Sequence, residues 1–204
     1  MHRLLYVMLI PLLWFIFKPG TQKKKINLPA IAVSSNKVFK ERLKNRCDEL
    51  LTYAKQKGYN TSYAFLVDMK ISSGSNRFFV CDLKKDSVLA SGLVTHGYGM
   101  SGDTISFSNT TGSNCTSLGK YKIGNAYHGH FGLAYKLYGL DNTNSNAINR
   151  FVVLHSHACV PVSEVAPKSI CMSQGCPTVS ASFLTVLKSH LDKAEKPVLL
   201  YIFY

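Results

Sequence analysis

The apolar positions between residues 39 and 54 follow a helical period. They recur at steps of four, four, three and four, in the order Phe39, Leu43, Cys47, Leu50 and Ala54. This spacing places all of them on one face of a helix. We expect Ser34 or Ser35 to cap the start of this helix and Gly58 to cap its end.

From residue 59 the pattern changes to short runs rich in β-branched and aromatic residues, separated by clusters of Gly, Asn and Ser. The runs are YAFLVDM, RFFVCDL, SVLASGLVTH, GKYKIG, GLAYKLYGL and RFVVLHS. They predict a mainly antiparallel β fold. One further helix is predicted in ASFLTVLKSHLDK, with Phe183, Leu184, Leu187 and Leu191 on one face, and PVLLYIFY predicts a final buried strand. The fold class is therefore mainly β, with two helices packed outside.

The N-terminus carries an apolar segment that bears on location. Residues 4–17, LLYVMLIPLLWFIF, are uncharged, which is short for a membrane span of about 20 residues but suits a signal peptide. No small-x-small cleavage site follows closely, so residues 1–17 are expected to be a signal peptide or an N-terminal membrane anchor. Lys18 and residues 23–25 place more positive charge after the segment than before it, which opposes export, although long domains are exported despite such charge. We expect export, with a basic linker at 18–34 and one folded domain at 35–204.

The composition indicates a class of binding partner but not a particular one. The chain has 204 residues with a formal net charge of +13, from 24 basic and 11 acidic residues. This excess favours anionic partners, but no RNA-binding module or zinc-finger spacing is present, so nucleic acid is not expected. The six cysteines are too few to require a disulfide framework. If the domain is exported, Cys159 and Cys171 could pair, which the sequence leaves open.

A glycine-rich stretch and a cluster of histidines and cysteines offer three kinds of site. Gly97 to Gly102 matches G-x-G-x-x-G, but DTISFSNTTGS is a poor helix opening, so a glycine-rich turn is favoured over a nucleotide site. His155, His157 and Cys159 alternate, which on a strand would turn all three to one face as zinc ligands. However, there is no C-x-x-C pair, and a buried cysteine beside a strand histidine is the third, purely structural alternative.

A cysteine nucleophile fits the same residues better. His155 ends an apolar run, and Cys176 lies in a Ser-x-Gly-Cys turn shortly before a helix. A neighbouring imidazole makes the thiolate accessible, because a free thiol has a pKa of about 8.5. Gly175 leaves room for a substrate to approach the backbone, and the amides of Gly175 and Cys176 are candidate donors to an oxyanion.

These residues resemble the signature of the YkuD-type L,D-transpeptidases, and more closely the murein L,D-transpeptidase catalytic domain family. The signature corresponds here to His155-Ser156 followed by Ser173-Gln174-Gly175-Cys176. The resemblance also covers THGYGMSGD, FSNTTGSNCTSLGKYKIGNAYHGHFG, YKLYGLD and GCPTVS, and runs from about residue 36 to the C-terminus. It implies the L,D-transpeptidase sandwich or barrel with outer helices, and it explains HGYGMSG as a family loop.

The resemblance also implies roles for single residues. Cys176 would be the nucleophile and His155 the general base, with Ser156 supporting the histidine through its backbone carbonyl. The turn containing Ser173, Gln174 and Gly175 would supply oxyanion donors. The closer family usually reads His-Gly-Ala where this chain has His155-Ser156-His157, so His157 is the alternative base. Many relatives carry Arg two residues after the cysteine, where this chain has Thr178, which leaves substrate preference open.

The implied activity is a cut between the third residue and the terminal D-alanine of a peptidoglycan stem tetrapeptide. A thioester acyl-enzyme would pass the acyl group to an amine, forming a 3→3 cross-link, without metal or cofactor. The alternatives are an L,D-carboxypeptidase, in which water is the acceptor, and a non-catalytic wall- or metal-binding module on the same scaffold. The expected partners are stem peptides and the anionic cell wall, in the periplasm or cell envelope, with residues 4–17 as a candidate inner-membrane anchor.

Overall fold

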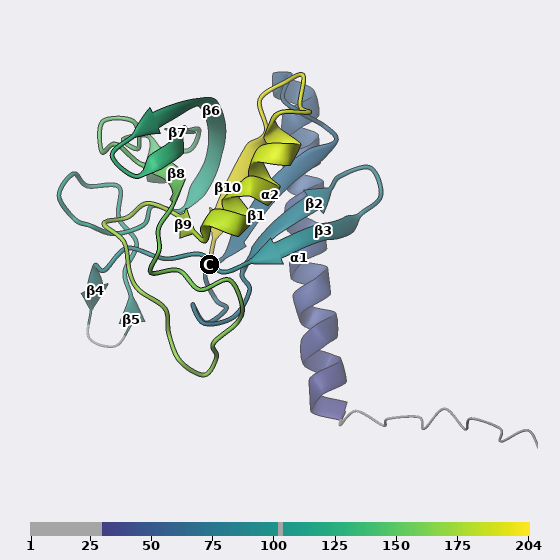
Figure 1. Ribbon diagram of the computed structural model, residues 1–204. Helices are drawn as coiled ribbons and strands as arrows, with labels where there is room; N and C mark the ends of the chain where they lie inside the picture. The colour runs from purple at the N-terminus through teal and green to yellow at the C-terminus, as the bar shows by residue number, and fades with distance from the viewer. Residues whose placement is uncertain (1–29, 102–103) are drawn as a thin grey trace, which may run out of the picture.

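The computed structural model describes residues 30–101 and 104–204, and an eight-stranded sheet dominates this part of the chain (Figure 1). The helices are α1 (Ala30–Lys57) and α2 (Ala181–Leu191), with a short 3-10 turn η1 (Asn142–Asn144). The strands of the large sheet are β1 (Tyr63–Asp68), β2 (Phe78–Asp82), β3 (Ser87–Gly92), β6 (Gly119–Gly129), β7 (Gly132–Gly139), β8 (Val153–Ser156), β9 (Thr178–Val179) and β10 (Leu199–Phe203). A separate hairpin pairs β4 (Met100–Ser101) with β5 (Thr104–Ile105).

The large sheet is mixed and is not closed into a barrel. Its strand order is β3-β2-β1-β10-β6-β7-β8-β9, so β3 and β9 form its two edges. The pairs β1–β10 and β8–β9 are parallel, and the other neighbouring pairs are antiparallel. The predicted mainly β fold with two outer helices is confirmed, as is the final buried strand, which becomes β10 in the centre of the sheet.

The two helices cover opposite faces of the sheet. Strand side chains alternate between faces, so each face presents apolar side chains to one helix. In β1, Phe65 and Val67 belong to one buried cluster with α2, whereas Ala64 and Leu66 belong to another with α1. The apolar face predicted for the first helix packs into the second cluster. Leu50 on that face is fully buried, and truncating such a leucine to alanine costs about 2–5 kcal/mol.

The helix ends follow local chemistry. Helix α1 begins at Ala30, within the predicted linker and before Ser34 or Ser35, where a cap was expected. Its C-terminal end agrees with the prediction, because Gly58 adopts a φ of 75°, a left-handed conformation that glycine reaches without steric cost. At the start of α2 the Ser180 side chain accepts a hydrogen bond of 3.2 Å from the amide of Phe183, which satisfies one free helix donor.

The fold brings two segments of the expected signature together at one edge of the sheet. β8 ends in His155 and Ser156, and β9 lies parallel beside it just after Cys176, with His155 opposite Thr178. The long β6–β7 hairpin extends along the other side of β8. The predicted signal peptide or anchor, and the linker up to residue 29, lie outside the described residues. Within the described ranges, no helix combines the length and apolar character that crossing a membrane requires.

Candidate active site

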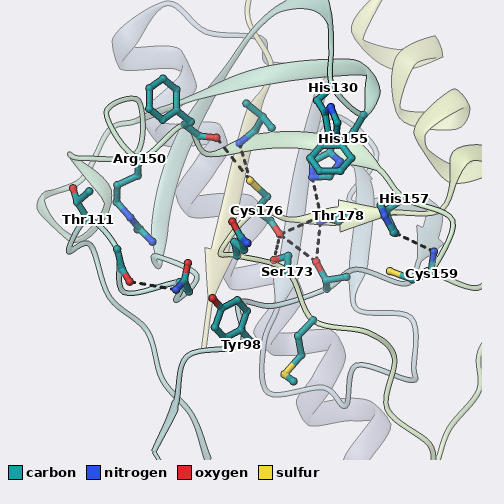
Figure 2. A pocket seen from close by; sticks show the side chains of 18 of the residues that line it. Tyr98, Thr111, His130, Arg150, His155, His157, Cys159, Ser173, Cys176 and Thr178 are labelled. Atoms are coloured by element: carbon teal, nitrogen blue, oxygen red, sulfur yellow. Dashed lines mark hydrogen bonds between the residues drawn. The ribbon is translucent and has the colours of Figure 1, made fainter.

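A cavity of about 730 Å³ opens beside β8 and β9, and both His155 and Cys176 line it (Figure 2). Its walls come from four stretches far apart in the sequence: 95–98, 111–114, the β6–β7 hairpin, and the segments flanking β8 and preceding β9. Among the described residues, the lining contains Arg150 and three histidines but no aspartate or glutamate. The charge of Arg150 therefore suits the cavity to an anionic or polar ligand.

His155 is held by hydrogen bonds at both ring nitrogens. Its Nδ1 lies 3.1 Å from the carbonyl oxygen of Ser156, and its Nε2 lies 3.1 Å from the hydroxyl of Thr178. Because a carbonyl can only accept, Nδ1 must carry the proton, so the neutral ring presents Nε2 as its acceptor. The ring of Phe131, from the β6–β7 hairpin, stacks on His155 at 4.7 Å between centroids. His155 is 5% exposed.

His157 is placed quite differently. It lies just beyond β8 and is exposed, and its Nδ1 accepts a hydrogen bond of 3.1 Å from the amide of Cys159. Since β8 ends at Ser156, the residues that follow do not continue the strand alternation required for a common metal-binding face. The structure therefore distinguishes the two candidate bases: His155 is buried and fixed, and His157 is solvated at the cavity rim.

The turn before Cys176 is fixed by short-range and long-range hydrogen bonds. The hydroxyl of Ser173 accepts from the amide of Gly175 at 3.1 Å and donates to the carbonyl of Cys176 at 2.6 Å. The backbone of Ser173 also pairs with residues 96–98 on a neighbouring segment. Gly175 has a φ of 111°, and a Cβ there would lie 2.6 Å from the carbonyl oxygen of Cys115. Only glycine fits this bend without displacing the backbone.

The Cys176 thiol lies between two backbone groups of the segment that enters β8. The amide of Val153 donates to Sγ at 3.4 Å, and Sγ donates to the carbonyl of Phe151 at 3.8 Å. Phe151 has a φ of 55°, which is rare for a bulky residue. It is the carbonyl of this residue that accepts the hydrogen bond from the thiol. The Val153 amide can stabilise a thiolate, whereas the Phe151 carbonyl can bind only the protonated thiol.

The thiol and the imidazole share the cavity but are not hydrogen bonded to each other. Among the described residues, the partners of the His155 ring are Ser156 and Thr178. Proton transfer from Cys176 to His155 would therefore require the thiol to give up its weak hydrogen bond to the Phe151 carbonyl.

Burial moves both titrating groups toward their neutral forms. It lowers the pKa of His155, against the opposing effect of the Ser156 carbonyl, and the nearby His157 lowers it further. Burial also raises the pKa of the Cys176 thiol, while the Val153 amide and the charge of Arg150 act in the opposite direction. Desolvation disfavours charge in either group, so burial favours the neutral thiol and the neutral imidazole.

Arg150 is a cation beside the turn that carries Cys176, and the sequence analysis did not identify it. Its guanidinium donates to the carbonyls of Ser108 and Cys115 at 2.8 and 2.6 Å and lies near the hydroxyls of Ser113 and Ser117. No acidic partner lies within 4.0 Å among the described residues. Arg150 thus joins the 108–117 loop to the entry of β8 and leaves a positive charge near Sγ. An arginine in a polar loop carries no local sequence signal for this role.

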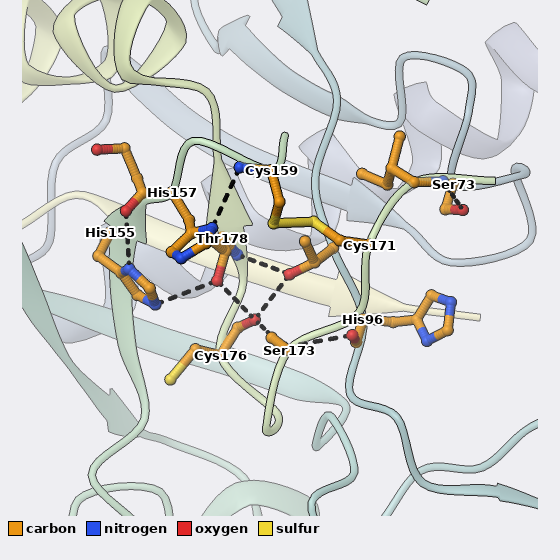
Figure 3. The surroundings of a disulfide bond; sticks show 12 residues. Ser73, His96, His155, His157, Cys159, Cys171, Ser173, Cys176 and Thr178 are labelled. Carbon is orange, nitrogen blue, oxygen red and sulfur yellow. Dashed lines mark hydrogen bonds between the residues drawn. A yellow bond between two sulfur atoms is a disulfide. The ribbon is translucent and has the colours of Figure 1, made fainter. Parts of the chain in front are cut away.

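Two of the alternatives from the sequence receive direct structural information. Cys159 and Cys171 form a disulfide with a Cα–Cα distance of 6.1 Å (Figure 3), so neither is a thiolate available for zinc. Gly97 forms a bridge with Ser173, and a Cβ on Gly97 would lie 2.1 Å from the carbonyl oxygen of Asn114. This glycine permits close packing between its own loop and the segment at Asn114, and the described residues after it form β4 and β5, with no helix opening there.

The comparisons with known proteins agree with the sequence resemblance. The model of the L,D-transpeptidase catalytic domain family matches residues 34–203. No curated protein matches significantly. Among solved structures, an L,D-transpeptidase from Xylanimonas cellulosilytica is 11% identical, with a TM-score of 0.41 over 74% of this chain and 68% of that one.

Two further solved structures are similarly distant. A protein from Bdellovibrio bacteriovorus is 17% identical, with a TM-score of 0.44 over 72% of this chain and 49% of that one. The helical cell shape determining protein of Campylobacter jejuni is 11% identical, with a TM-score of 0.45 over 76% and 54%. The chain spans about half the length of these two proteins.

Proposed function

The chain belongs to the family of L,D-transpeptidase catalytic domains, whose model spans most of its length, and from this premise we propose that it is a cysteine-dependent peptidoglycan L,D-transpeptidase. The observation that carries the proposal is the placement of a half-buried thiol, hydrogen bonded by the Val153 amide, in one cavity with a buried imidazole whose acceptor is Nε2. The expected donor is a stem tetrapeptide ending in D-alanine.

The reaction follows from these groups in two steps. Nε2 of His155 takes the proton of the Cys176 thiol, and sulfur attacks the carbonyl carbon of the third residue. The bond to D-alanine then breaks, D-alanine leaves as the amine with a proton from the imidazolium, and a thioester remains. An amine from a second stem peptide then attacks the thioester carbonyl and loses a proton to His155. The C–S bond breaks, Cys176 leaves as the thiol with that proton, and a 3→3 cross-link results. Water in place of that amine makes the enzyme an L,D-carboxypeptidase.

The nucleophile turn supports an oxyanion site with one clear donor. Among the described residues, no hydrogen bond engages the amide of Cys176, whereas the amide of Gly175 is already bound to the Ser173 hydroxyl. We therefore assign the Cys176 amide as the principal donor, with Gly175, Ser173 and Gln174 shaping the turn around it. Loss of one such donor in other enzymes costs about 2.7–4 kcal/mol.

Replacing the nucleophile tests the proposal directly. Cys176→Ala should release no D-alanine from a disaccharide-tetrapeptide, a loss on the order of 10⁴-fold or more, with an unchanged circular dichroism spectrum. Cys47→Ala, which removes a free cysteine on α1 away from the cavity, is the matched control and should keep full activity. Intact-mass analysis of the products reports bond choice and acceptor together. Turnover by Cys176→Ala close to that of the unmodified protein would refute the nucleophile.

The two histidines can be separated in the same assay. We assign His155 as the base because it is buried and fixed at both nitrogens, with the Ser156 carbonyl holding its tautomer. His155→Gln should lower kcat by about 10²–10⁴-fold, whereas the exposed His157→Gln should change it by much less. The opposite order of the two losses would reassign the base to His157.

Location and partners follow from the same proposal. The Cys159–Cys171 disulfide supports export to an oxidising compartment, consistent with the periplasm or cell envelope, with residues 4–17 as the signal or anchor. The net charge of +13 favours attraction to an anionic wall. N-terminal mass analysis of the protein recovered from the envelope should show either cleavage before the basic linker or an intact anchor. Recovery solely from the cytoplasm would contradict this assignment.

A further inference from the structure

The hydroxyls around the Cys176 carbonyl form a network in which the direction of each hydrogen bond can be assigned. Thr95 accepts from the amide of Thr178 at 3.1 Å and donates to the Cys176 carbonyl at 3.1 Å. Ser173 donates to the same carbonyl at 2.6 Å. A carbonyl oxygen has two lone pairs, so these two hydroxyls satisfy it. The longer contact of 3.4 Å from the Thr178 hydroxyl is then a third, weaker alternative.

The Thr178 proton is therefore free to bind the histidine. Because the Ser156 carbonyl requires a proton on Nδ1, the neutral His155 ring has a bare Nε2 at 3.1 Å from Thr178 Oγ1. The hydroxyl donates to it. Thr178 and His155 are both buried and lie opposite each other in the β8–β9 pair, so this contact is set by backbone register and is not a chance surface encounter.

We propose, on the basis of the function assigned above, that Thr178 is a positioning residue for the base, with a hydroxyl that binds His155 Nε2 in both protonation states. During acyl transfer the S–H bond of Cys176 breaks, its proton goes to Nε2, and its electron pair stays on sulfur. Thr178 keeps its own proton, which turns from the ring to the long, weak contact of 3.4 Å with the Cys176 carbonyl and shares that oxygen with the Thr95 and Ser173 hydroxyls. Its oxygen then accepts from the new Nε2–H, so the buried imidazolium keeps both of its hydrogen bonds.

The consequence is a selective stabilisation of the charged pair. A hydrogen bond to a charged group contributes about twice as much as one to a neutral group, and here the charged ring is buried, where an unpaired N–H is costly. Removing the hydroxyl should therefore reduce the small population of the thiolate–imidazolium pair by about ten- to hundredfold. The free thiolate that forms at high pH needs no imidazolium and should be unaffected.

Alkylation of Cys176 by iodoacetamide across a pH series tests this without a peptidoglycan substrate. Below the pKa of the thiol the reaction proceeds through the thiolate–imidazolium pair. In Thr178→Val its rate should fall about ten- to hundredfold at neutral pH and converge with the unmodified protein at high pH. Thr178→Ser, which restores the hydroxyl, should stay within about threefold of the unmodified protein. Cys176→Ala supplies the background from the other thiols.

Thr185→Val is the control, since it removes a threonine hydroxyl that donates to the Ala181 carbonyl on α2 and takes no part in the network around the Cys176 carbonyl. It should not reproduce the loss confined to neutral pH. Equal losses in Thr178→Val at every pH, no loss, or the same loss in Thr178→Ser would overturn the proposal in favour of a purely structural threonine.

A second measurement needs no variant at position 178. Histidine labelled with ¹⁵N in the unmodified protein, with His155→Gln to identify its signal, should show the Nδ1–H tautomer and a hydrogen-bonded Nε2. An Nε2–H tautomer would contradict the assigned network. The release of D-alanine is measured separately, so a protein without that activity would refute the proposed reaction and leave these two readouts to decide the role of Thr178.

Discussion

Breaking the Cys159–Cys171 disulfide should destabilise the domain by an amount that depends on the length of the loop it closes. The two cysteines are separated by 12 residues in sequence, and the entropy of closing a loop of that size in the unfolded chain corresponds to about 3 kcal/mol at 25 °C. For a domain of this length, that loss should lower the Tm by about 6–12 °C. The double variant Cys159→Ser/Cys171→Ser reproduces the loss without a reductant.

The effect should extend to the active site because of where the bridge lies. Cys159 follows β8 shortly after His155 and His157, and Cys171 precedes the turn that carries Cys176. The disulfide therefore joins the chain just after His155 to the chain just before Cys176 (Figure 3). Cys159 and Met172 also line the cavity. Reduction should therefore lower kcat as well as Tm, whereas reduction of a disulfide remote from the cavity would lower Tm alone.

The assay is thermal unfolding with and without a thiol reductant, on the unmodified protein and on the double variant. The reductant should lower the Tm of the first and leave the second unchanged, because the free thiols of Cys47, Cys81 and Cys115 form no disulfide among the described residues. An equal fall in both proteins would show that the reductant acts elsewhere. An unmodified protein whose Tm does not respond to reduction would refute the loop-entropy reasoning.

Three further outcomes follow from burial and close packing. Burial lowers the pKa values of His96 and His155, so below pH 6.5 the unfolded chain binds more protons than the folded one. The free energy of unfolding should therefore fall as pH drops through that range. Urea titrations at pH 7.5 and 5.5 measure this change. Phe131→Ala removes the ring stacked on His155, so the His155 pKa should rise toward its ordinary value in an NMR titration. Gly97→Ala places a Cβ 2.1 Å from the Asn114 carbonyl, and a loss of about 1–3 kcal/mol is expected in the same unfolding assay.

The features predicted well from sequence are those with a local signature. The period of the first helix placed Leu43, Leu50 and Ala54 in the core, and the structure buries all three. The apolar face of α2 and the buried strand β10 were read in the same way. These elements owe their stability to the burial of a periodic apolar face, and that face is visible in a single segment of sequence.

The features that were missed depend on contacts between distant segments. Strand β9 has two residues and exists because it pairs with β8, so no propensity within it could reveal it. Phe131 reaches His155 from the tip of a hairpin, and Arg150 reaches the 108–117 loop through backbone carbonyls. The start of α1 at Ala30 was also missed, because the polar, Lys-rich stretch before residue 34 resembles a linker.

The directions of the two pKa shifts bear on whether a thiolate–imidazolium pair exists before the substrate arrives. A preformed thiolate–imidazolium pair requires the thiol to be more acidic than the imidazolium. Even the ordinary pKa values of 9.0 for cysteine and 6.5 for histidine favour the neutral pair by a factor of about 300. Burial raises the pKa of Cys176 and lowers that of His155, so the neutral pair is favoured further.

The thiolate–imidazolium pair is therefore only a minor population of the resting cavity, and in most molecules charge separates during the reaction. The thiol is protonated and bound to the Phe151 carbonyl at rest, which makes it inert toward solvent oxidants that attack thiolates. In the proposed reaction, a substrate carbonyl that enters the cavity supplies an electrophile. Sulfur attacks it as His155 takes the thiol proton. The Val153 amide, which donates to sulfur, and the Thr178 oxygen, which we propose accepts from the imidazolium, then stabilise charges that appear during the transfer, where stabilisation increases the rate.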